Sequence, residues 1–146
     1  SRGSIITARL LVVDKSVVNA VMGGMGTDFT NPNWPRRILF YHAMMGDSIT
    51  ELKGAVDYVK QQHLDQLALA YLQRSQPSTS KEILSKIKTP VLVVCGDKDS
   101  DNGSAADLAK LLPDAEYATV PGDHHHASAT SEFSNAVMKF FKTHGY

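Results

Sequence analysis

The amino-acid sequence predicts an α/β fold built on a parallel sheet. Short apolar segments rich in valine alternate with helical patterns, which is typical of parallel sheets. The strand expected at 91–95 is apolar at every position, as in strands that helices cover on both faces. Polar residues or glycines follow each predicted strand. Because sites in such sheets lie at the carboxyl ends of the strands, these residues are the first candidates for function.

The first part of the core is expected at residues 1–26. Apolar residues recur near helical spacing over 4–13, which predicts a largely buried helix. Residues 17–22 are mostly apolar and rich in β-branched valine, which indicates a buried strand. Glycines follow at once in 23–26, and glycines at a strand's end indicate a sharp exit or a close backbone approach.

A helical insertion is expected at residues 27–85. Residues 27–37 are polar and contain two prolines, which predicts a loop, and 38–74 show helical patterning without strand alternation. Ser80 stands where a helix N-cap is expected, and the acidic Glu82 in the first turn suits the helix dipole.

The second part of the core is expected at residues 86–146. It contains the apolar strand at 91–95, a helix at 105–112, a strand at 116–120 and an amphipathic helix at 132–142. The predicted order of the whole chain is therefore helix, strand, helical insertion, strand, helix, strand, helix.

Composition narrows the classes of function. The chain has 146 residues, 15 basic and 15 acidic side chains and no basic stripe, so nothing indicates nucleic-acid binding. No apolar run approaches the roughly 20 residues of a membrane-spanning helix. Its single cysteine, Cys95, ends an apolar run and is interpreted as a small core residue. The absence of a visible secretion signal favours a cytoplasmic setting.

Acids and histidines follow the last two predicted strands. They are Asp97, Asp99 and Asp101 after the first strand, and His124, His125 and His126 after the second. A carboxylate and an imidazole at neighbouring strand ends are two of the three parts of a Ser-His-Asp triad.

Metal binding is the competing interpretation of these two loops, and the spacing disfavours it. The acids resemble a calcium loop, but Gly103 stands at its seventh rather than its sixth position and Leu108 occupies the twelfth, where a glutamate is required. Three consecutive histidines rarely converge on one zinc ion. We therefore expect no metal and no cofactor.

The start of the chain supplies a candidate nucleophile. Ser1-Arg2-Gly3 followed by a helix matches the second half of the Gly-x-Ser-x-Gly nucleophile elbow. Together with Gly96-x-x-Asp99 and Gly122-x-x-His125, these residues make the chain similar to the C-terminal half of the α/β-hydrolase family. The resemblance covers nearly the whole chain and implies a helical cap at 27–85.

The resemblance implies a role for each site residue. Ser1 is the nucleophile, His125 the base and Asp99 the acid that orients the base. His124 and His126 remain alternatives for the base, since three histidines stand side by side. The backbone N–H of Arg2 is an expected oxyanion donor. The order serine, aspartate, histidine along the chain also fits the family.

The family's earlier strands have no counterpart in these residues, nor has the loop that gives the second oxyanion donor. We therefore expect the N-terminal half of the fold to come from an upstream segment or from a second chain.

The expected function is a serine hydrolase that cleaves small-molecule esters or related acyl bonds through an acyl-enzyme. One alternative enzyme is an N-terminal-nucleophile hydrolase, which the helix directly after Ser1 disfavours. The non-enzymatic alternative is a ligand-binding member, or an inactive fragment, of the same fold.

Overall fold

The computed structural model describes residues 1–145, which form two compact units. The first unit combines residues 1–31 with the chain from Pro77 onward, and the second is Pro32–Gln76. The first unit contains the sheet and every candidate residue named above.

The sheet has three parallel strands in the order β1-β2-β3, as the alternation of strands and helices predicts. β1 is Ala20–Gly23, β2 is Val91–Gly96 and β3 is Ala115–Val120. β2 lies in the middle and all six of its residues are buried, which explains why its sequence is apolar throughout. Because the strands are parallel, the loops that follow them meet at one edge of the sheet.

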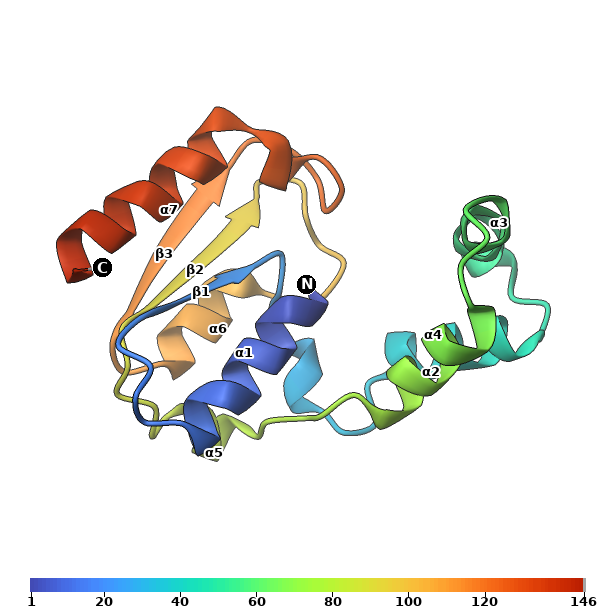
Figure 1. Ribbon diagram of the computed structural model, residues 1–146, viewed down its shortest axis with the longest axis horizontal. Coiled ribbons are helices and arrows are strands. Elements are labelled where there is room, and N and C mark those ends of the chain that lie inside the picture. Colours follow the sequence, from blue (N-terminus) through green and yellow to red (C-terminus); the bar gives the residue numbers. More distant parts are fainter. Residues whose placement is uncertain (146) are drawn as a thin grey trace. The chain divides into compact units, whose positions relative to one another are not determined.

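Helices cover both faces of this sheet. α1 (Arg2–Val13) packs against β1, and α6 (Ala105–Leu111) packs against β2 and β3. α7 (Ser131–His144) lies on the opposite side of the sheet from α1 and α6 (Figure 1). This arrangement is the helix–sheet–helix layering of an α/β domain.

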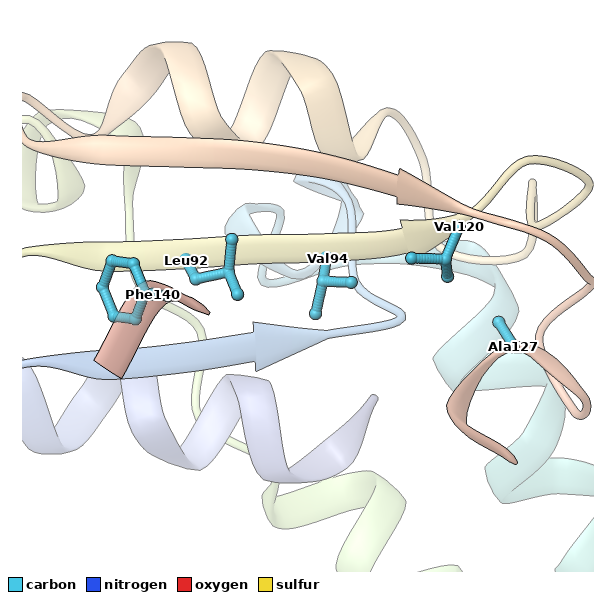
Figure 2. Packing of buried hydrophobic residues seen from close by; sticks show 5 residues of the cluster. All are labelled: Leu92, Val94, Val120, Ala127 and Phe140. Carbon is cyan, nitrogen blue, oxygen red and sulfur yellow. The ribbon is translucent and has the colours of Figure 1, made fainter. Parts of the chain in front are cut away.

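The core on the α7 side follows from the alternation of side chains along β2. Leu92 and Val94 point to one face, where they meet Phe140 of α7 together with Val120 and Ala127 (Figure 2). Phe140 is 1% exposed and is the largest member of this cluster. Its burial holds α7 against the strands that carry the acid and histidine loops.

Short elements complete the first unit. The 3₁₀ turn η1 (Thr27–Thr30) contacts α6, and the one-turn helix α5 (Lys81–Leu84) contacts α1. A second 3₁₀ turn, η3 (Ala127–Ala129), follows the histidines. The predicted N-cap at Ser80 is confirmed, since its hydroxyl accepts a hydrogen bond from the N–H of Ile83.

The second unit is helical, as its sequence pattern predicts. It consists of α2 (Pro35–Met45), the 3₁₀ turn η2 (Thr50–Leu52), α3 (Lys53–Gln61) and α4 (Gln66–Ser75). Met44, Val59 and Ala70 form its small core. The unit is shorter than the insertion expected at 27–85, because η1 and α5 pack in the first unit.

Several element boundaries differ from the sequence prediction. β1 begins at Ala20 rather than at residue 17, and Val18 is 68% exposed. α1 begins at Arg2, so Ser1 is its N-cap residue. Within the described residues, no helix is both long enough and apolar enough to cross a membrane.

Candidate active site

Ser1, His124 and Asp99 form a continuous hydrogen-bonded chain. The Ser1 hydroxyl lies 3.2 Å from Nε2 of His124. Nδ1 of the same ring lies 2.9 Å from Oδ2 of Asp99. Since an ionised carboxylate can only accept, Nδ1 carries the proton, and Nε2 is free to accept from the serine hydroxyl. This is the arrangement in which a serine is paired with a base and the base with an orienting acid.

The three side chains come from three different elements. Ser1 stands at the N-terminus of α1, Asp99 in the loop after β2, and His124 in the loop after β3. The parallel sheet brings the last two together, because β2 and β3 are hydrogen-bonded neighbours that end at the same edge.

Ser1 does not behave as an ordinary helix cap. A serine at an N-cap usually accepts a hydrogen bond from a backbone N–H one turn ahead. Ser1 makes no side-chain cap hydrogen bond, and its hydroxyl contacts His124 instead. Gly3 in the first turn of α1 has open space around it, since a Cβ there would meet nothing within 4 Å.

Asp99 is buried and well supplied with donors. Its side chain is 3% exposed and that of His124 is 19% exposed. Burial alone would raise the pKa of Asp99, but hydrogen bonds from His124 and from the N–H of Asp101 outweigh it and hold the pKa below its ordinary value. Asp99 is therefore an ionised acceptor at neutral pH.

The structure places His124, rather than the expected His125, against both Asp99 and Ser1. The cause lies in Asp123, whose Oδ1 accepts from the backbone N–H groups of His125 and His126, each at 3.0 Å. The ring of His126 also contacts Asp123, with Nδ1 at 2.7 Å. His125 and His126 are exposed, and His124 alone of the three reaches Asp99 and Ser1.

The acid and histidine loops are fixed to each other by hydrogen bonds to the backbone of Gly122. Oδ1 of Asp97 accepts from the N–H of Gly122 at 2.9 Å, and the carbonyl of Gly122 accepts from Lys98 at 3.0 Å. A Cβ on Gly96 would overlap the Gly122 carbonyl, so glycine is required for this approach. Gly122 itself has φ 115°, in the region that favours glycine. The carboxylate of Asp97 thus links the two loops.

The glycine turn after β1 forms another wall of the site. Gly24 has φ 62°, and a Cβ there would lie 3.3 Å from Cε1 of His124. Asn102, buried at 7% exposure, donates from Nδ2 to the Gly24 carbonyl at 3.0 Å. Ser4 of α1 donates to the carbonyl of Gly23 at 2.9 Å. These contacts hold the turn beside the histidine.

Sequence reasoning missed the contributions of Cys95 and Asn102. The Cys95 thiol lies 3.4 Å from Oδ2 of Asp99, and Asn102 is the buried polar residue that contacts Gly24. A signal existed for Cys95, since it ends a strand immediately before the glycine of the acid loop. Asn102 stands in a run of polar residues, so no sequence pattern indicates that its side chain is buried.

A pocket of about 410 Å³ opens onto the hydrogen-bonded chain. It is lined by Ser1, Thr7, Gly24, Asp99, His124 and Phe133, among others, all in the first unit. Its size is within the range of pockets that bind small molecules. Among residues 1–145, no group of three or more potential ligand side chains is arranged to hold a metal ion.

Comparison with known proteins finds similarity at the level of the fold. No family model matches the chain, and no curated protein matches it either. Solved structures do match. The candidate non-heme bromoperoxidase BpoC from Mycobacterium tuberculosis H37Rv aligns with 99% of this chain, with a TM-score of 0.72 and 18% identity. This chain covers 65% of that protein.

Two further solved structures give the same result. The enol-lactonase from Burkholderia xenovorans LB400 aligns with 97% of this chain at 16% identity and a TM-score of 0.72, and 63% of it is covered. A serine hydrolase involved in carbazole degradation, the CarC enzyme, aligns with 97% at 20% identity and a TM-score of 0.62, and 60% of it is covered.

The chain therefore has part of an α/β-hydrolase fold, as the sequence motifs predict. It spans less than two thirds of the length of each of these three structures, so the likeness is to part of the fold.

Proposed function

We propose that the chain carries the catalytic triad of a serine hydrolase that cleaves small-molecule esters or related acyl bonds. The observation that carries this proposal is the unbroken contact from the Ser1 hydroxyl through His124 to Asp99, beside a pocket of small-molecule size. The shared fold of solved hydrolases supports it.

In this proposal Nε2 of His124 takes the hydroxyl proton of Ser1 as the serine oxygen attacks the acyl carbon. The resulting imidazolium is stabilised by the buried carboxylate of Asp99. His124 then returns the proton to the leaving alcohol, which leaves the acyl group on Ser1. Water then hydrolyses the acyl-enzyme. His124 takes a proton from the water as its oxygen attacks the acyl carbon, and then gives that proton to the Ser1 oxygen as the carboxylic acid leaves.

The N-terminus of α1 is the proposed source of oxyanion stabilisation. The first N–H groups of a helix have no acceptor within the helix, and Arg2 is the first residue of α1. Its N–H adjoins Ser1 in the chain, where the positive end of the helix dipole favours developing negative charge. No acidic residue stands in the first turn of α1 to compete with a substrate oxygen.

We further propose that additional chain completes the sheet and the oxyanion site, from the same protein or from a second one. Four apolar side chains near β1 are more than 40% exposed: Ile6, Leu10, Val13 and Val18. Exposed apolar side chains gathered on α1 and just before β1 suit burial against another element. In this account the added segment packs on α1 and pairs with the free edge of β1, and supplies a second oxyanion donor.

Hydrolysis of p-nitrophenyl esters by the full-length protein tests the proposed function. Ser1→Ala and Asp99→Asn should each remove most of the turnover, and for the acid a loss of about 10⁴-fold in kcat is the reference value. His126→Ala is the matched control: this exposed imidazole contacts Asp123 and lies outside the triad, so turnover should stay near that of the unaltered protein. Turnover that persists in Ser1→Ala would contradict the proposal, and absence of turnover in the unaltered protein would favour the ligand-binding alternative.

A further inference from the structure

Cys95 is a buried thiol for which the proposed reaction has no use. It is the fifth residue of β2, is 4% exposed and forms no disulfide. Its Sγ lies 3.4 Å from Oδ2 of Asp99 and 4.0 Å from the backbone oxygen of Asp99. The carboxylate is the nearer acceptor and the charged one, so it is the better partner for the thiol proton.

The thiol completes a set of three donors around one carboxylate. Oδ2 of Asp99 accepts from Nδ1 of His124 at 2.9 Å as well as from Cys95, and Oδ1 accepts from the N–H of Asp101 at 3.2 Å. The donors come from β2, from the acid loop and from the histidine loop. A carboxylate held from three directions has little freedom to rotate away from the imidazole.

The same surroundings make Cys95 unsuitable as a nucleophile. Burial, and then the nearby negative charge and hydrogen bond of Asp99, raise the pKa of the thiol to about 11. Because the thiolate is the reactive form of cysteine, the thiol is almost wholly protonated at neutral pH. A protonated thiol remains a hydrogen-bond donor.

We propose that Cys95 is a positioning residue, whose thiol donates to Asp99 and fixes the carboxylate against His124. The catalytic role of Cys95 rests on the proposed function, whereas its hydrogen bond to Asp99 can be tested whether or not the protein hydrolyses esters. The titratable side chains that interact with Asp99 are His124 and Cys95, while Asp101 contributes its backbone N–H.

The test is the pKa of Asp99, measured from the pH dependence of its carboxyl ¹³C resonance in the full-length protein. The thiol hydrogen bond favours the ionised carboxylate, so Cys95→Ala should raise the pKa of Asp99. Cys95→Ser keeps a donor and should return the pKa towards that of the unaltered protein. The Nδ1–H resonance of His124 should shift in Cys95→Ala and recover in Cys95→Ser.

Val93→Ala is the matched control. Val93 stands two residues before Cys95 on the same face of β2 and is fully buried, and it has no donor to offer. Its truncation should lower stability and leave the titration of Asp99 unchanged. A merely structural role for Cys95 predicts the same result for Cys95→Ala as for Val93→Ala, and that result would overturn the proposal.

A reciprocal measurement keeps the proposal testable if Cys95→Ala does not fold. Asp99→Asn removes the charge that disfavours the thiolate, so the thiol pKa should fall. Each unit of that fall means about tenfold more thiolate, and hence up to about tenfold faster alkylation of Cys95 by iodoacetamide at pH 8. The global unfolding rate of each variant is measured in parallel, so that faster alkylation caused by a lower thiol pKa can be distinguished from faster alkylation caused by unfolding. Equal alkylation rates in both proteins, after that correction, would overturn the proposal whether or not the protein hydrolyses esters.

Discussion

The charged carboxylate of Asp99 is almost fully buried from water. It stays ionised because donors from the histidine loop and from its own loop replace that water. The contact with Nδ1 also orients the ring of His124, the proposed base. The sequence indicated this acid through Gly96-x-x-Asp99 alone, since neither its burial nor its donors can be inferred from residue spacing.

The identity of the base is the first prediction at this scale. His124→Ala should lower kcat by about 10³-fold or more, because the serine loses the group that removes its proton. His125→Ala should change kcat by less than about threefold, since that ring is exposed and contacts His124 only edge-on. Steady-state kinetics of the two variants, which remove the same side chain one residue apart, check the assignment. A reversed order of effects would contradict it.

Asp99 also predicts a pH dependence of stability. Its folded-state pKa is lowered, so the unfolded state binds the proton more readily and the native state gains stability above the unfolded-state pKa. This contribution should disappear as the pH falls through about 4 and below. Urea unfolding at neutral pH and at about pH 3 should show a larger acid loss for the unaltered protein than for Asp99→Asn. Equal losses would contradict this.

The three histidines show why part of the site could not be predicted from sequence. The spacing from Gly122 favoured His125, and only the backbone of the loop decides which ring turns inward. A signal was present in Asp123, because aspartate often accepts from N–H groups two and three residues ahead and so begins a turn there. That pattern engages the N–H groups of His125 and His126 and leaves His124 to face Asp99.

At the scale of elements, the site depends on two loops that approach each other closely after β2 and β3. Gly96 ends β2 beneath the Gly122 carbonyl, and Asp97 accepts from the N–H of Gly122. Phe140 of α7 packs in one apolar cluster with Val120 and Ala127, the residues on either side of the histidine loop. β2 was predictable because its sequence is apolar throughout. The contact between the two loops was not, because no local sequence pattern indicates a contact between segments far apart in the chain.

Gly96→Ala tests that contact. The added methyl group would meet the Gly122 backbone rather than a flexible side chain, so the loops must separate. The expected cost is at least about 2 kcal/mol of unfolding free energy, together with loss of turnover. Gly54→Ala in α3 is the control, because a Cβ there meets nothing within 4 Å, and it should be neutral or stabilising by up to about 1 kcal/mol. Chemical denaturation of both variants measures the difference, and equal stability would contradict the account.

At the scale of the whole molecule, the sheet is narrow and has apolar side chains exposed near β1. The sequence indicated three strands and a helical insertion, and the structure contains both. The sequence could not predict where the insertion begins and ends, because η1 and α5 belong to the first unit only through their contacts with α6 and α1. The exposed apolar residues of α1, together with Val18 just before β1, are the basis for the proposed additional segment.

This proposal predicts how residues 1–146 behave when produced alone. The exposed apolar side chains should promote self-association, visible in sedimentation velocity, and should bind a hydrophobic dye. Leu10→Glu with Val18→Lys should reduce both, whereas Ile83→Glu on α5, also exposed, should have a smaller effect. A monodisperse monomer that does not bind the dye would contradict the proposed covering segment.

The central claim is that Ser1 is a nucleophile activated by His124 and Asp99, and a serine-directed fluorophosphonate probe tests it most directly. Applied to the full-length protein, the probe should form a covalent adduct that mass spectrometry maps to Ser1. Labelling should be lost in Ser1→Ala, nearly lost in His124→Ala and kept in His125→Ala. An adduct that survives Ser1→Ala, or labelling that His124→Ala leaves unchanged, would contradict the account.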